Sequence, residues 1–381
     1  MRQAVPLFPR RARNRRRAAA VAGAALLAAL AGATAEDVVL PVPEGVLPLE
    51  IPAENPLSAA KVELGKKLYF DPRLSKDDSV ACATCHDPAH AFAEPRATSL
   101  GVGGATGVRN SPTVLNAAFL HEQFWDGRAP TLEEQAKQPL VNPVEMAMAD
   151  HAAVEAKLSG IAEYAPLFRA AFGDERVTID RVAQAIASFE RTLISLEAPI
   201  DRFLAGDQAA ISESAQRGWH LYNGKARCNN CHGHIGAFPL FTDELYHNIG
   251  VAAKAVDFET LARQALARPE DLAKLAHEPG INQLGRFLVT KQQKDIGAFK
   301  TTHLRNVALT APYMHDGSEV TLEAVIDFYD RGGNANPWLD GGIRPLGLSA
   351  QEKADLVELM QTFTSDDLAR FADLAKLVPK R

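Results

Sequence analysis

The sequence contains few cysteines, few aromatic residues and, beyond its first 35 residues, no long hydrophobic run. Four cysteines among 381 residues are too few for disulfides to hold a protein of this size together. Aromatic residues make up 7%, and the net charge of −6 gives no reason to expect a nucleic-acid partner. The charged (23%) and hydrophobic (46%) fractions are typical of globular proteins, which excludes a mostly disordered or fibrous chain. We expect no stable membrane insertion, because no stretch of 18 apolar residues occurs.

The basic residues are concentrated at the N-terminus. Residues 1–35 contain seven arginines and no acidic residue, and an apolar run over 18–32 is followed by the small residues Ala33-Thr34-Ala35. This pattern predicts a secretory signal peptide that is cleaved near Ala35. The alternative is an uncleaved anchor, but the run is too short to span a bilayer as a helix. Losing seven arginines takes the net charge from −6 to −13, so we expect an acidic protein exported to the periplasm.

All four cysteines lie in two C-x-x-C-H motifs, Cys82–His86 and Cys228–His232. In this motif two thiols bind the haem vinyl groups as thioethers, and the adjacent histidine is held under the iron. A four-cysteine zinc site would not need a histidine after each pair. A thioredoxin-like dithiol would need a βαβ pattern, and none surrounds either motif. The motifs therefore predict two covalently bound c-type haems, with Cys82, Cys85 and His86 at the first and Cys228, Cys231 and His232 at the second.

A weak internal repeat accompanies these motifs. The pattern G-x-x-L-Y begins at Gly65 before the first motif and at Gly218 before the second. Each copy ends a helical pattern, 58–69 with Ser58 at its start and 212–222. We interpret each half as a small cytochrome c-like unit; the alternative is chance similarity between two amphipathic helices.

The rest of the chain is predicted to be mainly helical with long loops. Further helices are expected over 150–160, 164–172, 178–194, 322–329 and 349–363, and one helix or a helix pair is expected over 254–277. The glycine- and proline-rich stretches 101–107 and 332–347 are interpreted as loops, the second packed against a haem. The predicted fold class is mainly α: a signal peptide (1–35), an N-terminal cytochrome c-like domain (36–200) and a C-terminal one (201–381). The expected boundary is 199–207.

Six blocks of sequence around the two motifs resemble the di-haem cytochrome c peroxidase family, and within it the MauG-like branch. The blocks are GKKLYFD (65–71), CATCHDP (82–88), RNSPT (109–113), FWDGR (124–128), NPVEM (142–146) and LRNVALTAPYMHDG (304–317). Paired C-x-x-C-H motifs occur in many cytochromes, whereas the order of these blocks is far more specific. The resemblance extends over nearly the whole chain after the signal peptide.

The resemblance implies that the first haem reacts with peroxide. Glu145 matches the family's distal acid–base group, Gln135 the residue that orients peroxide or water, and His315 a residue near the same pocket. Taken alone, Gln135 would be a helix-surface residue, and Glu145 would cap a helix or form an ion pair. Many family members block this iron with a histidine from the loop after the first motif. The loop 99–109 has no histidine here, and His90 lies too close to His86 to match that ligand.

The second haem would store oxidising equivalents, and its second axial ligand distinguishes the two branches. The ligand is methionine in the peroxidase branch and tyrosine in the MauG-like branch. The matching position, fourteen residues after His315, is Tyr329. A phenolate is hard and anionic and favours higher oxidation states, whereas a thioether raises the potential. Taken alone, Tyr329 would be a core aromatic residue at a helix end, and Met314 is the rival ligand.

The resemblance also implies that the haems face the interface between the two domains and are connected there. Trp125 matches the bridging tryptophan, although most tryptophans are simply core residues. Trp219 and Trp338 lack this motif support, and either could be an exit for oxidation at the surface. The Asn110 side chain with the Thr310 and Pro312 carbonyls matches the family's calcium site, so one calcium ion is expected.

These inferences predict a periplasmic di-haem enzyme that uses hydrogen peroxide to oxidise a side chain of a partner protein, typically tryptophan. The first alternative is an ordinary cytochrome c peroxidase that takes electrons from a small cytochrome or copper protein. The second is a non-enzymatic electron carrier, in which both irons would have six ligands. The identity of the axial ligand at the second haem separates the first two hypotheses.

Overall fold

The computed structural model describes residues 38–234, 238–253, 255–268 and 272–380, and they are mainly helical. The α-helices are α1 (Ala59–Phe70), α2 (Cys82–Cys85), α3 (Leu132–Val141), α4 (His151–Ser159), α5 (Tyr164–Phe172), α6 (Ile179–Glu190), α7 (Pro199–Leu204), α8 (Glu213–Asn223), α9 (Phe258–Leu266), α10 (Leu272–Leu275), α11 (Phe287–Thr290), α12 (Leu322–Asp330) and α13 (Ala350–Gln361). The short 3-10 helices are η1 (Pro72–Leu74), η2 (Pro88–His90), η3 (Val102–Gly104), η4 (Ala117–Phe119), η5 (Gln208–Ala210), η6 (Cys228–Asn230), η7 (Ile281–Leu284), η8 (Gln293–Asp295), η9 (Val307–Leu309), η10 (Asp366–Phe371) and η11 (Leu374–Leu377). Two strands, β1 (Tyr246–His247) and β2 (Phe299–Lys300), pair antiparallel, with Tyr246 opposite Lys300. The mainly α prediction is confirmed.

The predicted helix starts are confirmed by their capping bonds. Ser58 accepts a hydrogen bond from the Lys61 N–H (3.3 Å), and Ser212 accepts one from the Ala215 N–H (3.2 Å). Ser349 and Glu352 form a capping box at α13. One predicted bound was wrong. Helix α6 ends at Glu190 instead of residue 194. The segment 254–277 contains a pair of helices, α9 and α10, which is one of the two expected arrangements.

The repeated glycines mark two equivalent helix pairs. A Cβ atom on Gly65 would lie 1.8 Å from the Ala185 carbonyl oxygen of α6, and one on Gly218 would lie 2.1 Å from the Asp355 carbonyl oxygen of α13. Only glycine allows the backbones of α1 and α6, and of α8 and α13, to approach so closely. The internal repeat is therefore a packing requirement that occurs once in each half.

A second repeat becomes visible in the backbone. The segment 116–132 and the segment 306–322 share left-handed residues at matching positions: Asn116, Phe124 and Gly127 in the first, and Asn306, Met314 and Gly317 in the second. Each segment ends at a threonine whose side chain caps a helix, Thr131 for α3 and Thr321 for α12. Trp125 of the first copy thus corresponds to His315 of the second.

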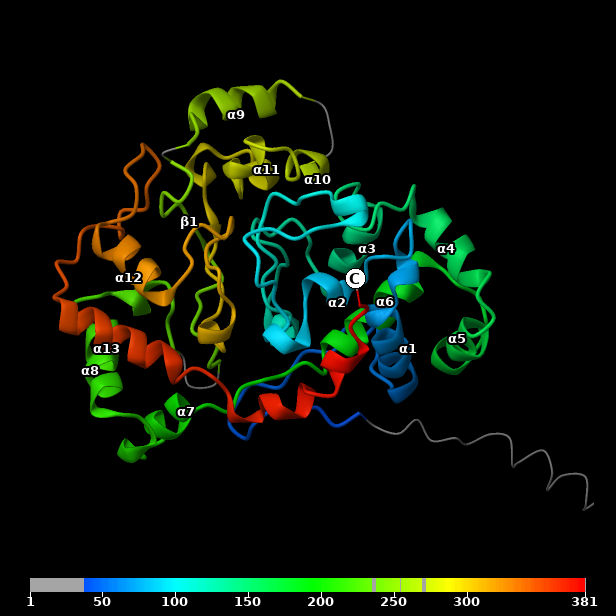
Figure 1. The fold of residues 1–381 in the computed structure, drawn as a ribbon, viewed down its shortest axis with the longest axis horizontal. Coiled ribbons are helices and arrows are strands. Elements are labelled where there is room, and N and C mark those ends of the chain that lie inside the picture. The colour runs from blue at the N-terminus through cyan, green and yellow to red at the C-terminus, as the bar shows by residue number, and fades with distance from the viewer. Residues whose placement is uncertain (1–37, 235–237, 254, 269–271, 381) are drawn as a thin grey trace, which may run out of the picture. The chain divides into compact units, whose positions relative to one another are not determined.

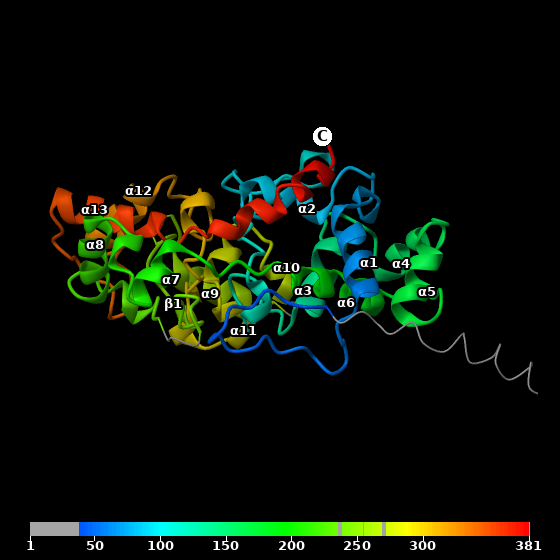
Figure 2. The ribbon, with the colours of Figure 1, turned by 90° about the horizontal axis from the view of Figure 1, so that it is seen from below.

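The hydrophobic core is divided between the two halves. One cluster gathers α1, α3 and α6 around Leu68 and Ile186, and another gathers α8, α12 and α13 around Leu359. These groups lie at opposite ends of the unit 38–381 in two perpendicular views (Figures 1 and 2). A third cluster joins α9, α10 and α11. After α13 the chain returns to the first half, where Phe371 packs on Phe92 with ring centroids 5.4 Å apart.

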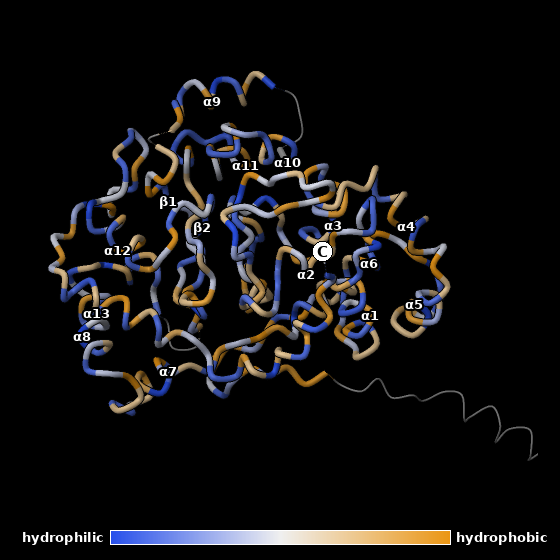
Figure 3. The backbone as a smooth tube through the Cα atoms, in the orientation of Figure 1, coloured by the Kyte–Doolittle hydropathy of each residue, from blue (hydrophilic) through white to orange (hydrophobic). Residues whose placement is uncertain are grey.

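The division into domains at residue 200 remains a prediction, and helix α7 occupies the expected boundary. Hydrophobic and hydrophilic residues alternate along the described helices (Figure 3). No helix within the described residues has the length and apolarity needed to cross a membrane. The predicted signal peptide lies outside the described residues.

Candidate functional site

A cavity lies beside each of the two C-x-x-C-H motifs. The first cavity, of about 180 Å³, is lined by Cys82, Cys85 and His86. The second, of about 300 Å³, is lined by Cys228, Cys231 and His232. Trp125 lines both cavities, and so does Asn110. The loop predicted to pack at the second haem contributes Gly342, Ile343 and Arg344 to the second cavity.

The two motif histidines are held in the same way. The Nδ1 of His86 lies 2.9 Å from the Pro112 carbonyl oxygen, and the Nδ1 of His232 lies 3.0 Å from the Phe241 carbonyl oxygen. Since a carbonyl only accepts, Nδ1 is the donor, and Nε2 keeps its lone pair. Burial lowers the pKa of both histidines, which favours the neutral form. Each histidine is therefore prepared to bind a metal through Nε2.

The cysteines fit haem attachment better than a redox or zinc site. Burial raises the pKa of Cys228 to about 12 and raises that of Cys82 further, so neither thiol has the lowered pKa of a reactive dithiol. In the described part of the chain, one group of three side chains could hold a metal ion: Cys231, Asp243 and His247. It contains one cysteine of one motif and neither motif histidine, so it does not match a four-cysteine zinc site.

The first cavity brings together the residues predicted to handle peroxide. Gln135 is positioned by α3, and Glu145 by the turn that follows it; both line the cavity. Burial raises the pKa of the Glu145 carboxyl, although the Arg128 cation and a hydrogen bond from Asn142 oppose the shift. A carboxyl with a raised pKa beside an open metal position can accept and return a proton.

One histidine that the sequence analysis did not single out lies at the first cavity. His90 pairs with Asp87 (3.5 Å) and is not among the described residues that line this cavity. The loop 99–109 contributes Ser99, Gly101 and Arg109 but no histidine, as expected. His277, from the second half, does line the cavity. Sequence reasoning missed it because it lies in a segment recognised only by its amphipathic pattern, far from both motifs.

Both candidate axial ligands of the second haem, one with an oxygen atom and one with a sulfur atom, line the second cavity. Tyr329 comes from the last turn of α12, and Met314 comes from the tight turn before that helix. Burial raises the pKa of Tyr329, so its phenol would lose its proton only next to a strong cation such as a metal. The geometry thus brings both candidates to the same cavity.

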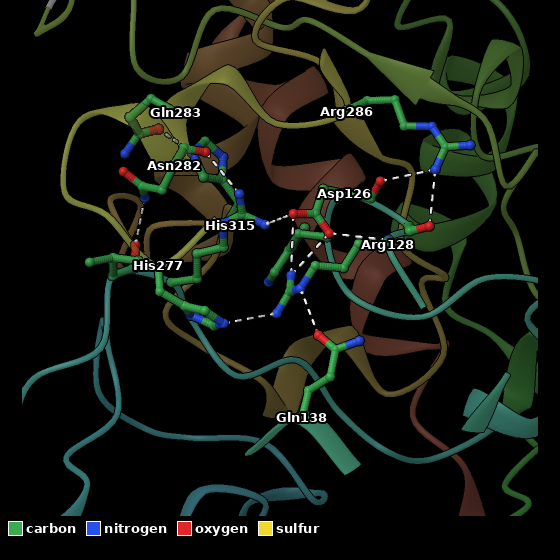
Figure 4. A network of polar contacts seen from close by, with 12 residues as sticks. Asp126, Arg128, Gln138, His277, Asn282, Gln283, Arg286 and His315 are labelled. Carbon is green, nitrogen blue, oxygen red and sulfur yellow. Dashed lines mark hydrogen bonds and ion pairs between the residues drawn. The ribbon is translucent and has the colours of Figure 1, made fainter. Parts of the chain in front are cut away.

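Trp125 and His315 meet between the halves. The Trp125 Nε1–H donates to the Asn110 carbonyl (2.9 Å), and the Trp125 and His315 rings lie 6.4 Å apart. His315 is 2% exposed, stacks on Phe299 (3.6 Å) and contacts Gln283 Oε1 through Nε2 at 2.6 Å (Figure 4). It is not among the described residues lining either cavity. The structure therefore places His315 beside Trp125, and its predicted role near the first cavity stays a prediction.

The three residues predicted to bind calcium all line the second cavity: Asn110, Thr310 and Pro312. The Asn110 side-chain nitrogen donates to the Arg96 carbonyl (3.1 Å), so its amide oxygen is the atom that would bind a cation. Of the other tryptophans, Trp219 is half-buried and stacks on Tyr222 at 5.4 Å, and Trp338 packs on Phe258 at 6.2 Å.

A family model and individual known sequences point to the same protein family. A family model described as "Di-haem cytochrome c peroxidase" matches residues 59–209. The chain is 40% identical over 319 residues to the "Methylamine utilization protein MauG" of Methylorubrum extorquens, covering 84% of this chain and 82% of that protein. It is also 39% identical over 288 residues to the "Cytochrome c551 peroxidase" of Pseudomonas aeruginosa, covering 75% of each.

Solved structures show the same fold. A "MauG-like protein associated with microbial copper homeostasis" is 33% identical, with a TM-score of 0.72, and the match covers 87% of this chain and 97% of the other. The "diheme peroxidase BthA" from Burkholderia thailandensis has a TM-score of 0.65 at 23% identity, with 82% and 87% covered. At that identity the second likeness concerns the fold alone.

Proposed function

Because the chain belongs to the di-haem cytochrome c peroxidase family, and is a haem-dependent peroxidase with two c-type haems, we propose that it is an enzyme of MauG type. It uses hydrogen peroxide to oxidise a side chain of a partner protein, most simply tryptophan, by long-range electron transfer. Haem bound at the first cavity would supply the reaction with peroxide, and haem bound at the second would supply redox chemistry. The protein supplies ligands, proton transfer and the connection between the two cavities.

The observation that carries this proposal is the position of Tyr329 at the second cavity, together with His232. A tyrosine phenolate would give the iron of the second haem a hard, anionic ligand. Such a ligand favours higher oxidation states of the iron over the uptake of one electron from a donor. An enzyme that stores oxidising equivalents can withdraw electrons from a partner that never enters a pocket. The likeness to proteins named MauG and MauG-like supports this choice.

At the first cavity, Glu145 and Gln135 handle the peroxide. Glu145 takes a proton from the bound peroxide and returns it to the departing oxygen, which needs a carboxylate whose pKa is closer to neutrality than usual. Gln135, on the same wall, orients the peroxide or water by hydrogen bonding. The loop 99–109 contains no histidine that could bind a haem held by His86, which would leave room for peroxide.

Between the cavities, Trp125 conducts the oxidising equivalent. It lines both cavities, and the Asn110 carbonyl holds its indole N–H. Asn110, Thr310 and Pro312 would hold one calcium ion through oxygen atoms beside this tryptophan. His315 contributes by packing against the same ring.

The protein works in the periplasm in this proposal. The seven arginines, apolar run and small residues of 1–35 are the features of an export signal. Haem attachment outside the cytoplasm is compatible with this location. The remaining chain carries −13, which favours a partner with a basic surface.

The second candidate function is cytochrome c peroxidase activity, in which a small cytochrome or copper protein donates electrons. The presence of Met314 in the same cavity as Tyr329 is the observation that favours it. A thioether ligand would raise the potential of the second haem and make it an electron acceptor. The likeness to proteins named as cytochrome c peroxidases supports this candidate.

The two functions are separated by the ligand of the second haem. We expect electron paramagnetic resonance of the resting ferric protein to show one high-spin and one low-spin haem. Tyr329→Phe should remove the low-spin signal of its haem and the spectral change that peroxide causes there, with both haems still attached. Met314→Leu is the matched control and should change neither. The reverse pattern would support the cytochrome c peroxidase function.

A further inference from the structure

His277 connects the second half of the chain to the peroxide cavity of the first half. It follows α10 and is half-buried at the wall that also contains Glu145, Gln135 and Arg128. Its Nε2 lies 3.4 Å from Arg128 Nη2, as Figure 4 shows. The Asn142 side-chain nitrogen lies 3.1 Å from its Nδ1 and 3.2 Å from its Nε2.

Both neighbours of the imidazole are donors. The guanidinium of Arg128 has no acceptor atom, and the atom of Asn142 that faces the ring is its NH₂ nitrogen. Asn142 Oδ1 is engaged separately, because it accepts from the Val144 N–H at 3.2 Å. Nε2 is the ring nitrogen that lies near both donors, so a neutral His277 with its proton on Nδ1 can accept there from Arg128 and Asn142. Burial, reinforced by the Arg128 and Arg109 cations, lowers the pKa of His277 to about 4, in agreement with this role.

The two donors are the same groups that act on Glu145. The Asn142 side chain hydrogen-bonds Glu145, and the Arg128 cation opposes the rise of the Glu145 pKa. Asn142 also fixes the backbone of this turn, since its carbonyl accepts the Glu145 N–H at 3.1 Å and the Ala147 N–H at 2.9 Å. Arg128 is fixed from the other side by Asp126 (3.0 Å) and Gln138 (3.0 Å).

We propose that His277 is a positioning residue for the peroxide reaction: it accepts the N–H groups of Arg128 and Asn142 and so keeps both from turning fully toward Glu145. The inference rests on the acid–base role proposed for Glu145. Without this acceptor, the N–H groups of Arg128 and Asn142 that face His277 would be left unsatisfied in a buried place and would turn toward the Glu145 carboxylate, on which both residues already act. The carboxylate would then be a weaker base, and the peroxide would be held less accurately.

The peroxide cavity is consequently completed by a residue from the opposite half. Asn282 on the same segment strengthens the connection, because its carbonyl accepts from Arg109 (2.8 Å) and its side chain donates to the Val108 carbonyl (3.2 Å). The charged groups that face His277 are Arg128, Arg109 and Asp126, and Lys274 and Glu278 are its neighbours along the chain. Arg128 and Cys82, whose thiol is consumed by haem attachment, are the titratable groups that interact with Glu145.

The test compares His277→Phe, which keeps a ring but removes the acceptor, with His277→Gln, which restores an acceptor oxygen. In the di-haem holoenzyme, we expect His277→Phe to slow the reaction with peroxide roughly 10-fold at neutral pH. The pH at which the rate falls on the acidic side should move down by about one unit, because the released donors favour the Glu145 carboxylate. His277→Gln should keep the parent profile, and His220→Phe, an exposed histidine on α8, is the control.

A second measurement does not depend on turnover. Binding of fluoride to the ferric holoenzyme, followed by its visible spectrum across pH, should show the same downward shift for His277→Phe and none for His277→Gln. Equal losses in both variants, or a parent-like profile in His277→Phe, would overturn the inference. So would conversion of a low-spin resting signal into a high-spin one in His277→Phe, since His277 would then be a ligand. If Glu145→Gln leaves the profile unchanged, the failure lies in the role proposed for Glu145.

Discussion

In both halves of the molecule, a glycine-containing helix packs against a second helix and delivers a tyrosine to the motif histidine. The Tyr69 hydroxyl donates to the His86 carbonyl (3.2 Å), and the Tyr222 hydroxyl donates to the His232 carbonyl. Each histidine then donates Nδ1–H to a backbone carbonyl. The proximal sides of the two cavities are therefore built from the same parts.

The opposite sides differ at one helix position. Counting eight residues from the capping threonines Thr131 and Thr321 leads to Pro139 on α3 and Tyr329 on α12. Both residues line their cavities. The proline side chain has no atom that can bind a metal, whereas the tyrosine side chain has a phenolic oxygen. The two halves therefore share one backbone arrangement but can bind metal differently, because a single helix position either lacks or provides a side-chain ligand.

The equivalence of the two helix positions can be tested most directly by replacing Pro139. We expect Pro139→Tyr to place a phenol at the first cavity, as in the second half, and to abolish the reaction with peroxide. Electron paramagnetic resonance should then show loss of the high-spin signal. Proline is unfavourable inside a helix, so its replacement should not destabilise α3. A variant that stays high-spin and reacts normally would show that the two positions are not equivalent.

The functional difference between the two cavities can be tested at Glu145, which lines the first cavity. Glu145→Gln should slow the peroxide reaction by about 10²- to 10⁴-fold, because the base is lost. In the parent, burial raises the Glu145 pKa, and the carboxylate is the active form. The rate should therefore fall as the pH drops through a pKa above the ordinary glutamate value. A pH-independent rate in the parent would contradict this assignment, and stopped-flow spectroscopy measures both.

The structural similarity can be tested at the two glycines. Gly65→Ala and Gly218→Ala should each destabilise the protein by about 1–3 kcal/mol, since a Cβ would collide with a carbonyl oxygen of the facing helix. Gly341→Ala is the matched control, because nothing lies within 4 Å of its Cβ. Denaturant unfolding followed through the haem absorption gives the free energy. A loss at one glycine alone would show that the helix pairs are not equivalent.

Much of the fold could be predicted because its signals are local. The Ser58, Ser212 and Ser349 caps fixed the starts of three helices, and the paired motifs fixed which residues face the haems. The end of α6 was predicted too late, since the apolar pattern continues to Leu193 and Ile194, which are buried but not helical. Hydrophobic periodicity reports burial and does not by itself report where hydrogen bonding stops.

Parts of the candidate site could not be predicted for a different reason. His277 lies 132 residues beyond Glu145, and nothing in its neighbourhood in the sequence resembles a site. Likewise, the correspondence of Trp125 with His315 depends on left-handed residues at matching positions, which become apparent from backbone angles. The role assigned to His315 near the peroxide pocket remains a prediction, and the structure places its ring against Trp125 and Phe299.

The amino-acid sequence alone determined the chemistry that each half can carry, because covalent attachment and ligation need particular atoms at fixed short spacings. Cys82, Cys85 and His86 can be recognised without knowing where the chain goes next. Only the tertiary structure decided which distant groups surround those atoms. The contact of His277 with Arg128 and Asn142 forms when the halves pack together, and burial in that packing is what changes the proton affinities of the site.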